Sequence, residues 1–240
     1  MKRIKGVIFD YGGTLDTNGV HWFQIFRRAY AECLPQVAEE QLRSAYVYAE
    51  RYLAAHRVIE PEDDFLAMLR KKVDIQLSCL SVVGCRQAVV GNRISLYCDA
   101  LVRRNMEHTR DILAMLAARY PLVLVSNFYG NIHAVLHSYG IQNYFKDVIE
   151  SAVVGVRKPD PQIFLFGVEA LGLYPEEVLV VGDSYEKDIV PASTLGCRTI
   201  WLKGQGWNAA DDAPESICAD RVIDSLEEIL PYIGAILKVL

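Results

Sequence analysis

Short runs typical of buried strands recur along this sequence and alternate with stretches of helical periodicity. The runs lie at residues 7–9, 122–125, 148–149, 178–181 and 198–202, and a further short one lies at residues 221–224. Most of these runs are apolar throughout, which is typical of strands that helices cover on both faces. Because strands that alternate with helices form parallel sheets, we predict an α/β fold with a doubly wound parallel sheet.

One long stretch interrupts this alternation. Between about residues 21 and 106 the apolar residues recur every three or four positions, which is helical spacing, and Pro35 breaks the run. The composition is 52% hydrophobic, so a chain of 240 residues has enough apolar side chains for a core domain and a smaller second domain. We predict a core domain of residues 1–17 and 106–240, with a separate helix at 109–120, and an inserted helical bundle of residues 18–105.

Polar side chains stand directly after several of the predicted strands. Asp10, Ser126 and Asp183 each follow such a run, and Lys158 lies in the loop after another. The carboxyl ends of parallel strands meet at one edge of a sheet, where ligands bind in open α/β folds. We therefore expect these four side chains to lie close together.

This set of side chains predicts a particular chemistry. Two carboxylates at close range repel each other unless a proton or a cation lies between them, and oxygen ligands of this kind suit Mg²⁺. Lys158 and Ser126 would hold the oxygens of a phosphoryl group, and a helix that begins at Ser126 and Asn127 would favour an anion. Asp10 would act as the nucleophile and form an aspartyl-phosphate that water later hydrolyses.

Composition and charge exclude several other functions. The formal net charge is -5 and no basic run is present, which argues against a nucleic-acid-binding protein. No stretch is long and apolar enough to span a bilayer. The six cysteines show no CxxC spacing and no signal peptide precedes them, so we expect reduced thiols in a cytoplasmic protein. His133 and His137 lie one helical turn apart, but further zinc ligands are lacking, so we expect a solvated helix face.

Four motifs, taken in order and spacing, resemble the haloacid dehalogenase-like superfamily. They are residues 8–15 (IFDYGGTL), 123–127 (VLVSN), 158–161 (KPDP) and 180–184 (VVGDS), the last followed by Asp188. The resemblance spans nearly the whole chain. It implies a Rossmann-like core and identifies the helical insert as similar to the family's C1 cap, which closes over the site and selects the substrate.

The resemblance also implies a role for each matching residue. Asp10 corresponds to the nucleophile, which is also a Mg²⁺ ligand, and Asp183 corresponds to the second carboxylate ligand. Gly12 stands where the family coordinates Mg²⁺ through a backbone carbonyl. Ser126, Asn127 and Lys158 fall at the phosphate-binding positions, and Thr14 and Asp188 at supporting ones.

At one position the sequence departs from the family. Most phosphatases of this family carry a second Asp two residues after the nucleophile, which protonates the leaving oxygen, and Gly12 stands there instead. A positioned acid or base contributes about 10²–10⁴-fold. We therefore expect a slow phosphomonoesterase, a substrate such as an acyl phosphate whose leaving group needs no proton, or an acid supplied by the cap or the substrate. Asp16 lies beyond the turn, and we do not assign it this role.

The resulting expectation is a Mg²⁺-dependent hydrolase that acts on a small phosphorylated metabolite, as a monomer or homodimer. The alternative is a catalytically weak or inactive binding or regulatory protein with the same fold, for which Gly12 is the argument. A phosphorylated switch of the receiver type fits the aspartyl-phosphate chemistry, but such a switch needs no cap of this size. The dehalogenase branch of the family works without Mg²⁺ and has an Arg-lined site, to which nothing around Gly12 points.

Overall fold

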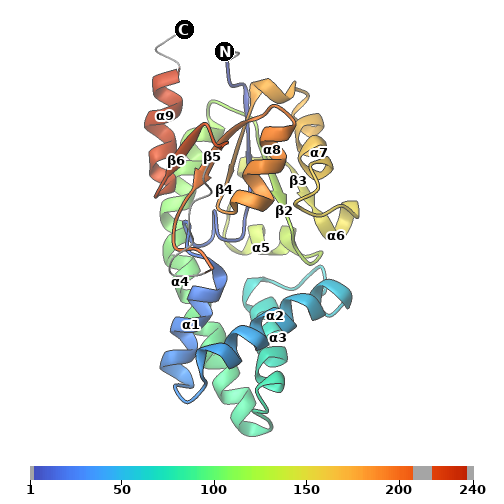
Figure 1. Ribbon diagram of the computed structural model, residues 1–240, viewed down its shortest axis with the longest axis vertical. Coiled ribbons are helices and arrows are strands. Elements are labelled where there is room, and N and C mark those ends of the chain that lie inside the picture. Colours follow the sequence, from blue (N-terminus) through green and yellow to red (C-terminus); the bar gives the residue numbers. More distant parts are fainter. Residues whose placement is uncertain (1–2, 208–217, 237–240) are drawn as a thin grey trace.

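The computed structural model describes residues 3–207 and 218–236 and contains a six-stranded parallel sheet (Figure 1). The strands are β1 (Gly6–Phe9), β2 (Leu122–Ser126), β3 (Phe145–Glu150), β4 (Val178–Gly182), β5 (Arg198–Leu202) and β6 (Arg221–Ile223). Their order across the sheet is β3-β2-β1-β4-β5-β6, and every neighbouring pair is parallel. The predicted doubly wound α/β fold is confirmed. Residues 203–216 are polar and contain glycine, which predicts a loop, and the part of this stretch from residue 208 lies outside the described residues.

Helices cover both faces of the sheet. One face packs against α4 (Cys85–Ala117), α5 (Ile132–Ser138) and α9 (Ile229–Ile236), and the other against α7 (Gln162–Leu171) and α8 (Val190–Thr194). Successive strand residues point to opposite faces, so Val7 and Phe9 join the first core while Ile8 joins the second. This double burial is why the strands read as apolar runs without alternation.

The helical insert lies below the sheet in Figure 1, on the side where the strands end. It comprises α1 (Trp22–Cys33), α2 (Glu39–Ala55), α3 (Phe65–Cys79) and the first part of α4. Asp64 caps α3 by accepting a hydrogen bond from the Ala67 N–H at 2.8 Å. Within the described part of the chain, no helix is both long and apolar enough to cross a membrane.

The predicted break between the insert and a helix at 109–120 is wrong. A single helix of 33 residues, α4, runs through this position and joins the insert to the sheet (Figure 1). Its buried stripe continues across the expected boundary through Val102, Met106, Thr109 and Leu113, with no proline or glycine to interrupt it. The predicted boundary at residue 106 therefore lies inside a continuous helix.

Several short helical turns complete the fold. They are α6 (Ser151–Val154), η1 (Gln142–Tyr144), η2 (Pro175–Glu177), η3 (Tyr185–Ile189) and η4 (Leu226–Glu228). The sequence predicts a helix over residues 188–195, closed by Gly196, but the helical structure begins earlier, at Tyr185, with a wide π-helical turn that continues into α8. Turns of this kind are frequent at functional sites, and this one carries Asp188.

Candidate active site

Asp10 lies directly after β1 and is 6% exposed. Its main-chain N–H donates to the Val181 carbonyl of β4 at 3.0 Å, which fixes the residue at the middle of the sheet. The Lys158 ammonium donates to Oδ1 at 2.6 Å, and the Thr14 hydroxyl lies 3.1 Å from Oδ2. Burial raises the pKa of Asp10 to about 6, although Lys158 opposes the rise.

Lys158 is shared between two carboxylates. Its Nζ also donates to Asp188 Oδ1 at 2.7 Å, and Asp188 Oδ2 accepts the Ser184 N–H at 3.0 Å. Burial alone would lower the pKa of Lys158, but Asp10 and Asp188 outweigh it and raise the pKa. The ammonium is therefore a fixed positive charge beside Asp10.

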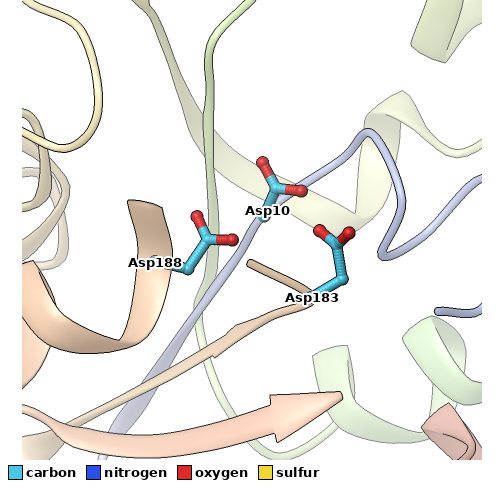
Figure 2. Close-up of side chains that lie close together, drawn as sticks. All are labelled: Asp10, Asp183 and Asp188. Atoms are coloured by element: carbon cyan, nitrogen blue, oxygen red, sulfur yellow. The ribbon is translucent and has the colours of Figure 1, made fainter. Parts of the chain in front are cut away.

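Asp183 follows β4 and faces Asp10 across the turn after β1 (Figure 2). Thr14 connects the two carboxylates, because its Oγ1 lies 3.2 Å from Asp183 Oδ1 and accepts the Asp183 N–H at 3.0 Å. Carboxylate oxygens of Asp10, Asp183 and Asp188 lie within 4.8 Å of one another. Burial, and after it the charge of Asp10, raise the pKa of Asp183 well above its usual range, so a proton or a cation is needed among these groups.

The two glycines of the turn have different environments. Gly13 has a φ of +97°, and a Cβ there would lie 2.3 Å from Asp183 Oδ2. Gly12 does not have a positive φ, and a Cβ there would meet no atom within 4 Å. Gly13 is therefore required for the backbone to approach Asp183, whereas the position of Gly12 has room for a side chain.

Gly13→Ala is expected to lower kcat at least about 100-fold, because the methyl group displaces the Asp183 carboxylate and displacements near 1 Å cost this much. Gly172→Ala is the matched control, because Gly172 also has a positive φ, an added Cβ there meets no atom within 4 Å, and the residue does not line the cavity; it should change kcat less than about threefold. Turnover of an aryl phosphate by the two purified variants measures the difference. Equal losses in both variants would show that the close approach to Asp183 is unimportant.

Asp16 holds the turn and the first helix of the insert in place. Its carboxylate accepts the Gly13 N–H and the Trp22 indole N–H, both at 2.7 Å. Burial raises its pKa to about 7. Each oxygen of Asp16 therefore accepts a hydrogen bond that stabilises the turn and the start of α1.

The stretch after β2 differs from its sequence prediction. Ser126 does not begin a helix, because α5 starts at Ile132. Asn127 instead clamps the loop that carries Lys158: its Oδ1 accepts the Lys158 N–H at 2.9 Å, and its Nδ2 donates to the Lys158 carbonyl at 3.1 Å. The loop after β2 and the loop between α6 and α7 are thereby tied together.

A cavity of about 210 Å³ opens beside these groups. Asp10, Gly12, Ser126, Asn127, Lys158, Asp183 and Asp188 line its sheet side. The insert contributes Tyr46, Glu50 and Lys72, and Tyr129 comes from the loop after β2. None of these four residues was predicted from the sequence to be part of the site. A signal existed for Lys72, which interrupts the buried apolar stripe of α3 between Leu69 and Val73.

Comparison with known proteins gives the family. The haloacid dehalogenase-like hydrolase family matches residues 4–196. Glyceraldehyde 3-phosphate phosphatase of Methanocaldococcus jannaschii is 27% identical, over 98% of this chain and 99% of that protein. Phosphoglycolate phosphatase of Shigella sonnei is 34% identical, over 96% of this chain and 93% of that protein.

Solved structures share the fold. A crystal structure of a dehalogenase with an intermediate complex has a TM-score of 0.66 at 17% identity, covering 97% of this chain and 98% of that one. The HAD-hydrolase YfnB of Bacillus subtilis, bound to magnesium, has a TM-score of 0.60 at 17% identity and covers 97% of this chain and 100% of that one.

The parallel sheet, with carboxylates and a lysine converging where its strands end, defines a doubly wound α/β protein whose site lies where such folds bind ligands. The chain belongs to the haloacid dehalogenase-like hydrolase family, as its four motifs predicted.

Proposed function

We propose that this protein is a Mg²⁺-dependent phosphatase that transfers the phosphoryl group of a small phosphomonoester to Asp10 and then to water. The observation that carries the proposal is the cluster of Asp10, Asp183 and Asp188 oxygens within 4.8 Å, with the Lys158 ammonium 2.6 Å from Asp10. Relatives named as phosphatases of small phosphorylated compounds support it. The dehalogenases among the structural neighbours share the fold at 17–23% identity, which carries no chemistry to this chain.

The donor set fits a hard divalent cation. Asp10 and Asp183 would hold Mg²⁺ through carboxylate oxygens, and Gly12 through its main-chain carbonyl, and such ligands suit this ion. When bound, the ion would offset negative charge on the phosphoryl oxygens.

The chain's own residues supply the remaining chemistry. A carboxylate oxygen of Asp10 attacks phosphorus, the bond between phosphorus and the alcohol oxygen breaks, and that oxygen leaves with the electron pair and takes a proton from solvent, because Gly12 supplies none. Lys158 holds Asp10 in place and balances the charge that develops, while Ser126 and the main-chain N–H of Asn127 donate to the phosphoryl oxygens. A water oxygen then attacks phosphorus, the bond between phosphorus and the Asp10 oxygen breaks, the proton of the water passes to solvent, and inorganic phosphate leaves with the Asp10 carboxylate restored.

The helical insert serves in this proposal as the cap over the site. Its residues Glu50 and Lys72 line the same cavity as Asp10, which supports the role of a cap. We keep the proposed core (residues 1–17 and 106–240) and cap (residues 18–105), although their second boundary lies inside α4. No disulfide joins the six cysteines, all of which are described, and this supports a place in the reducing cytoplasm.

Metal removal tests the proposal. Excess chelator should lower turnover of an aryl phosphate at least about 100-fold, because metal stabilisation of transition-state charge amounts to several kcal/mol, and added Mg²⁺ should restore the rate. Asp183→Asn should raise the Mg²⁺ concentration needed for half-maximal rate. The same rate with chelator and with Mg²⁺ would contradict a metal-dependent mechanism.

A phosphoryl-binding protein without turnover is the second candidate. The observation in its favour is Gly12, which places no acid or base where most phosphatases of the family carry one. In this reading Asp10, Lys158 and the cation would bind a phosphorylated ligand without reacting with it. Gly12→Asp, which restores a carboxylate at this position, separates the two functions.

A further inference from the structure

Four side chains form a hydrogen-bonded cluster on the wall of the cavity opposite the sheet: Tyr46, Glu50, Lys72 and Tyr129, here called the Glu50–Lys72 cluster. The Lys72 ammonium forms an ion pair with the Glu50 carboxylate and donates to the Tyr129 hydroxyl at 3.1 Å. The Tyr129 hydroxyl donates to Glu50 Oε2 at 2.6 Å, and Tyr46 also hydrogen-bonds Glu50. The cluster joins α2 and α3 of the insert to the loop after β2.

The two charged members of the cluster differ in exposure, and the Glu50 side chain is 31% exposed. The Lys72 side chain is 7% exposed, and its ammonium lies 5.4 to 5.8 Å from the ring centroids of Tyr129, Tyr46 and Phe26. Aromatic faces stabilise a cation at this distance. Burial raises the pKa of Glu50, but Lys72 and the two tyrosines outweigh burial and the net pKa is lowered, so the cluster holds both an anion and a cation.

The charges of the cluster determine which groups it can bind. An ammonium has three N–H donors and a carboxylate accepts about four hydrogen bonds. The contacts within the cluster do not use all of these, so Lys72 can still donate to a substrate group and Glu50 can still accept from one. An uncharged hydroxyl on the substrate could donate to Glu50 and accept from Lys72. A substrate carboxylate would gain Lys72 but approach the Glu50 anion, and like charges in a partly dehydrated site repel strongly.

The size of the cavity restricts the substrate further. Its volume of about 210 Å³ is below the 300–1,000 Å³ that is usual for sites of drug-sized ligands. The phosphoryl group would occupy the side lined by Asp10 and Lys158, so the rest of the substrate must be short to reach the cluster.

We propose that the Glu50–Lys72 cluster selects short phosphomonoesters whose leaving alcohol is uncharged and carries a second hydroxyl group, and that it discriminates against leaving alcohols that carry a carboxylate. This inference rests on the proposed phosphatase function and gives its substrate class.

Two probes of matched size test it. Glycerol 3-phosphate and 3-phosphoglycerate differ only by a hydroxymethyl group in place of a carboxylate. We expect kcat/KM of the wild-type protein to be at least about 10-fold higher for glycerol 3-phosphate, a modest share of the discrimination that a hydrogen-bonding site can reach. A wild-type preference for 3-phosphoglycerate would overturn the inference, and this measurement needs no variant.

Two variants should move this ratio in opposite directions. Glu50→Gln removes the repelling charge and should shift the ratio about 10-fold towards 3-phosphoglycerate, whereas Lys72→Met removes the cation and should shift it further towards glycerol 3-phosphate. Glu40→Gln and Lys71→Met lie on the same two helices away from the cavity lining and should leave the ratio unchanged.

An aryl phosphate serves as the reference substrate. If the wild-type protein hydrolyses it but the ratio is the same in the wild type, Glu50→Gln and Lys72→Met, the selectivity inference fails and the phosphatase function stands. If no phosphate ester is hydrolysed with Mg²⁺, the proposed function fails and the inference fails with it.

Discussion

Asp10→Asn is expected to lower kcat for an aryl phosphate by roughly 10⁴-fold or more, the scale on which enzymes lose activity when the nucleophile is removed. The amide nitrogen and oxygen of Asn cannot form the aspartyl-phosphate, and the exchange also removes one of the two carboxylates that hold Lys158. The measurement is steady-state turnover of wild type and variant under saturating Mg²⁺.

A matched control separates chemistry from folding. Asp111 lies exposed on α4 and does not line the cavity, and Asp111→Asn should leave kcat within about twofold, as is usual for surface substitutions. Thermal unfolding of the three proteins shows whether Asp10→Asn is folded. A folded Asp10→Asn protein with wild-type turnover would remove Asp10 from the mechanism.

Gly12→Asp is expected to raise kcat for an alkyl phosphate by about 10²–10⁴-fold, the usual contribution of a positioned acid or base. The geometry permits the change, since a Cβ at Gly12 meets no atom within 4 Å and the residue does not have a positive φ. The gain should be smaller for an aryl phosphate, whose leaving group needs less help from a proton.

Gly12→Asn is the control, because it has the same shape without the proton-transfer chemistry and should give no such gain. If Gly12→Asp leaves the rate unchanged while the wild-type protein binds inorganic phosphate tightly, the phosphoryl-binding function is favoured over turnover. A gain confined to Gly12→Asp would show that the wild-type enzyme is limited by proton transfer.

The pattern of strands and the position of Asp10, Ser126, Lys158 and Asp183 could be predicted because both depend on local sequence. Apolar runs report burial on both faces, and parallel strands that end in polar residues must place those residues at a common edge. The structure brings Lys158 to 2.6 Å from Asp10 across 148 residues of chain, as this rule requires.

Element boundaries were predicted less well, for a physical reason that α4 illustrates. The stripe of Val102, Met106 and Leu113 has the same spacing whether it packs within the insert or against the sheet. The periodicity therefore does not change where the packing partner changes, and it cannot give the boundary. Similarly, Ser126 and Asn127 have the residue types of a helix start, but the Asn127 amide bonds to the Lys158 main chain instead.

The sequence by itself determined the parallel sheet, the family and the edge of the sheet at which the site residues lie. Short-range apolar patterns and the spacing of the motifs encode each of these. Only the tertiary structure decided what faces that edge. Tyr129 meets Glu50 and Lys72 across 79 and 57 residues of chain, and no local pattern reports such a contact between helices and a loop. The same holds for Gly12 and Gly13, which are identical in sequence but differ in φ and in distance to Asp183 because the turn closes on only one of them.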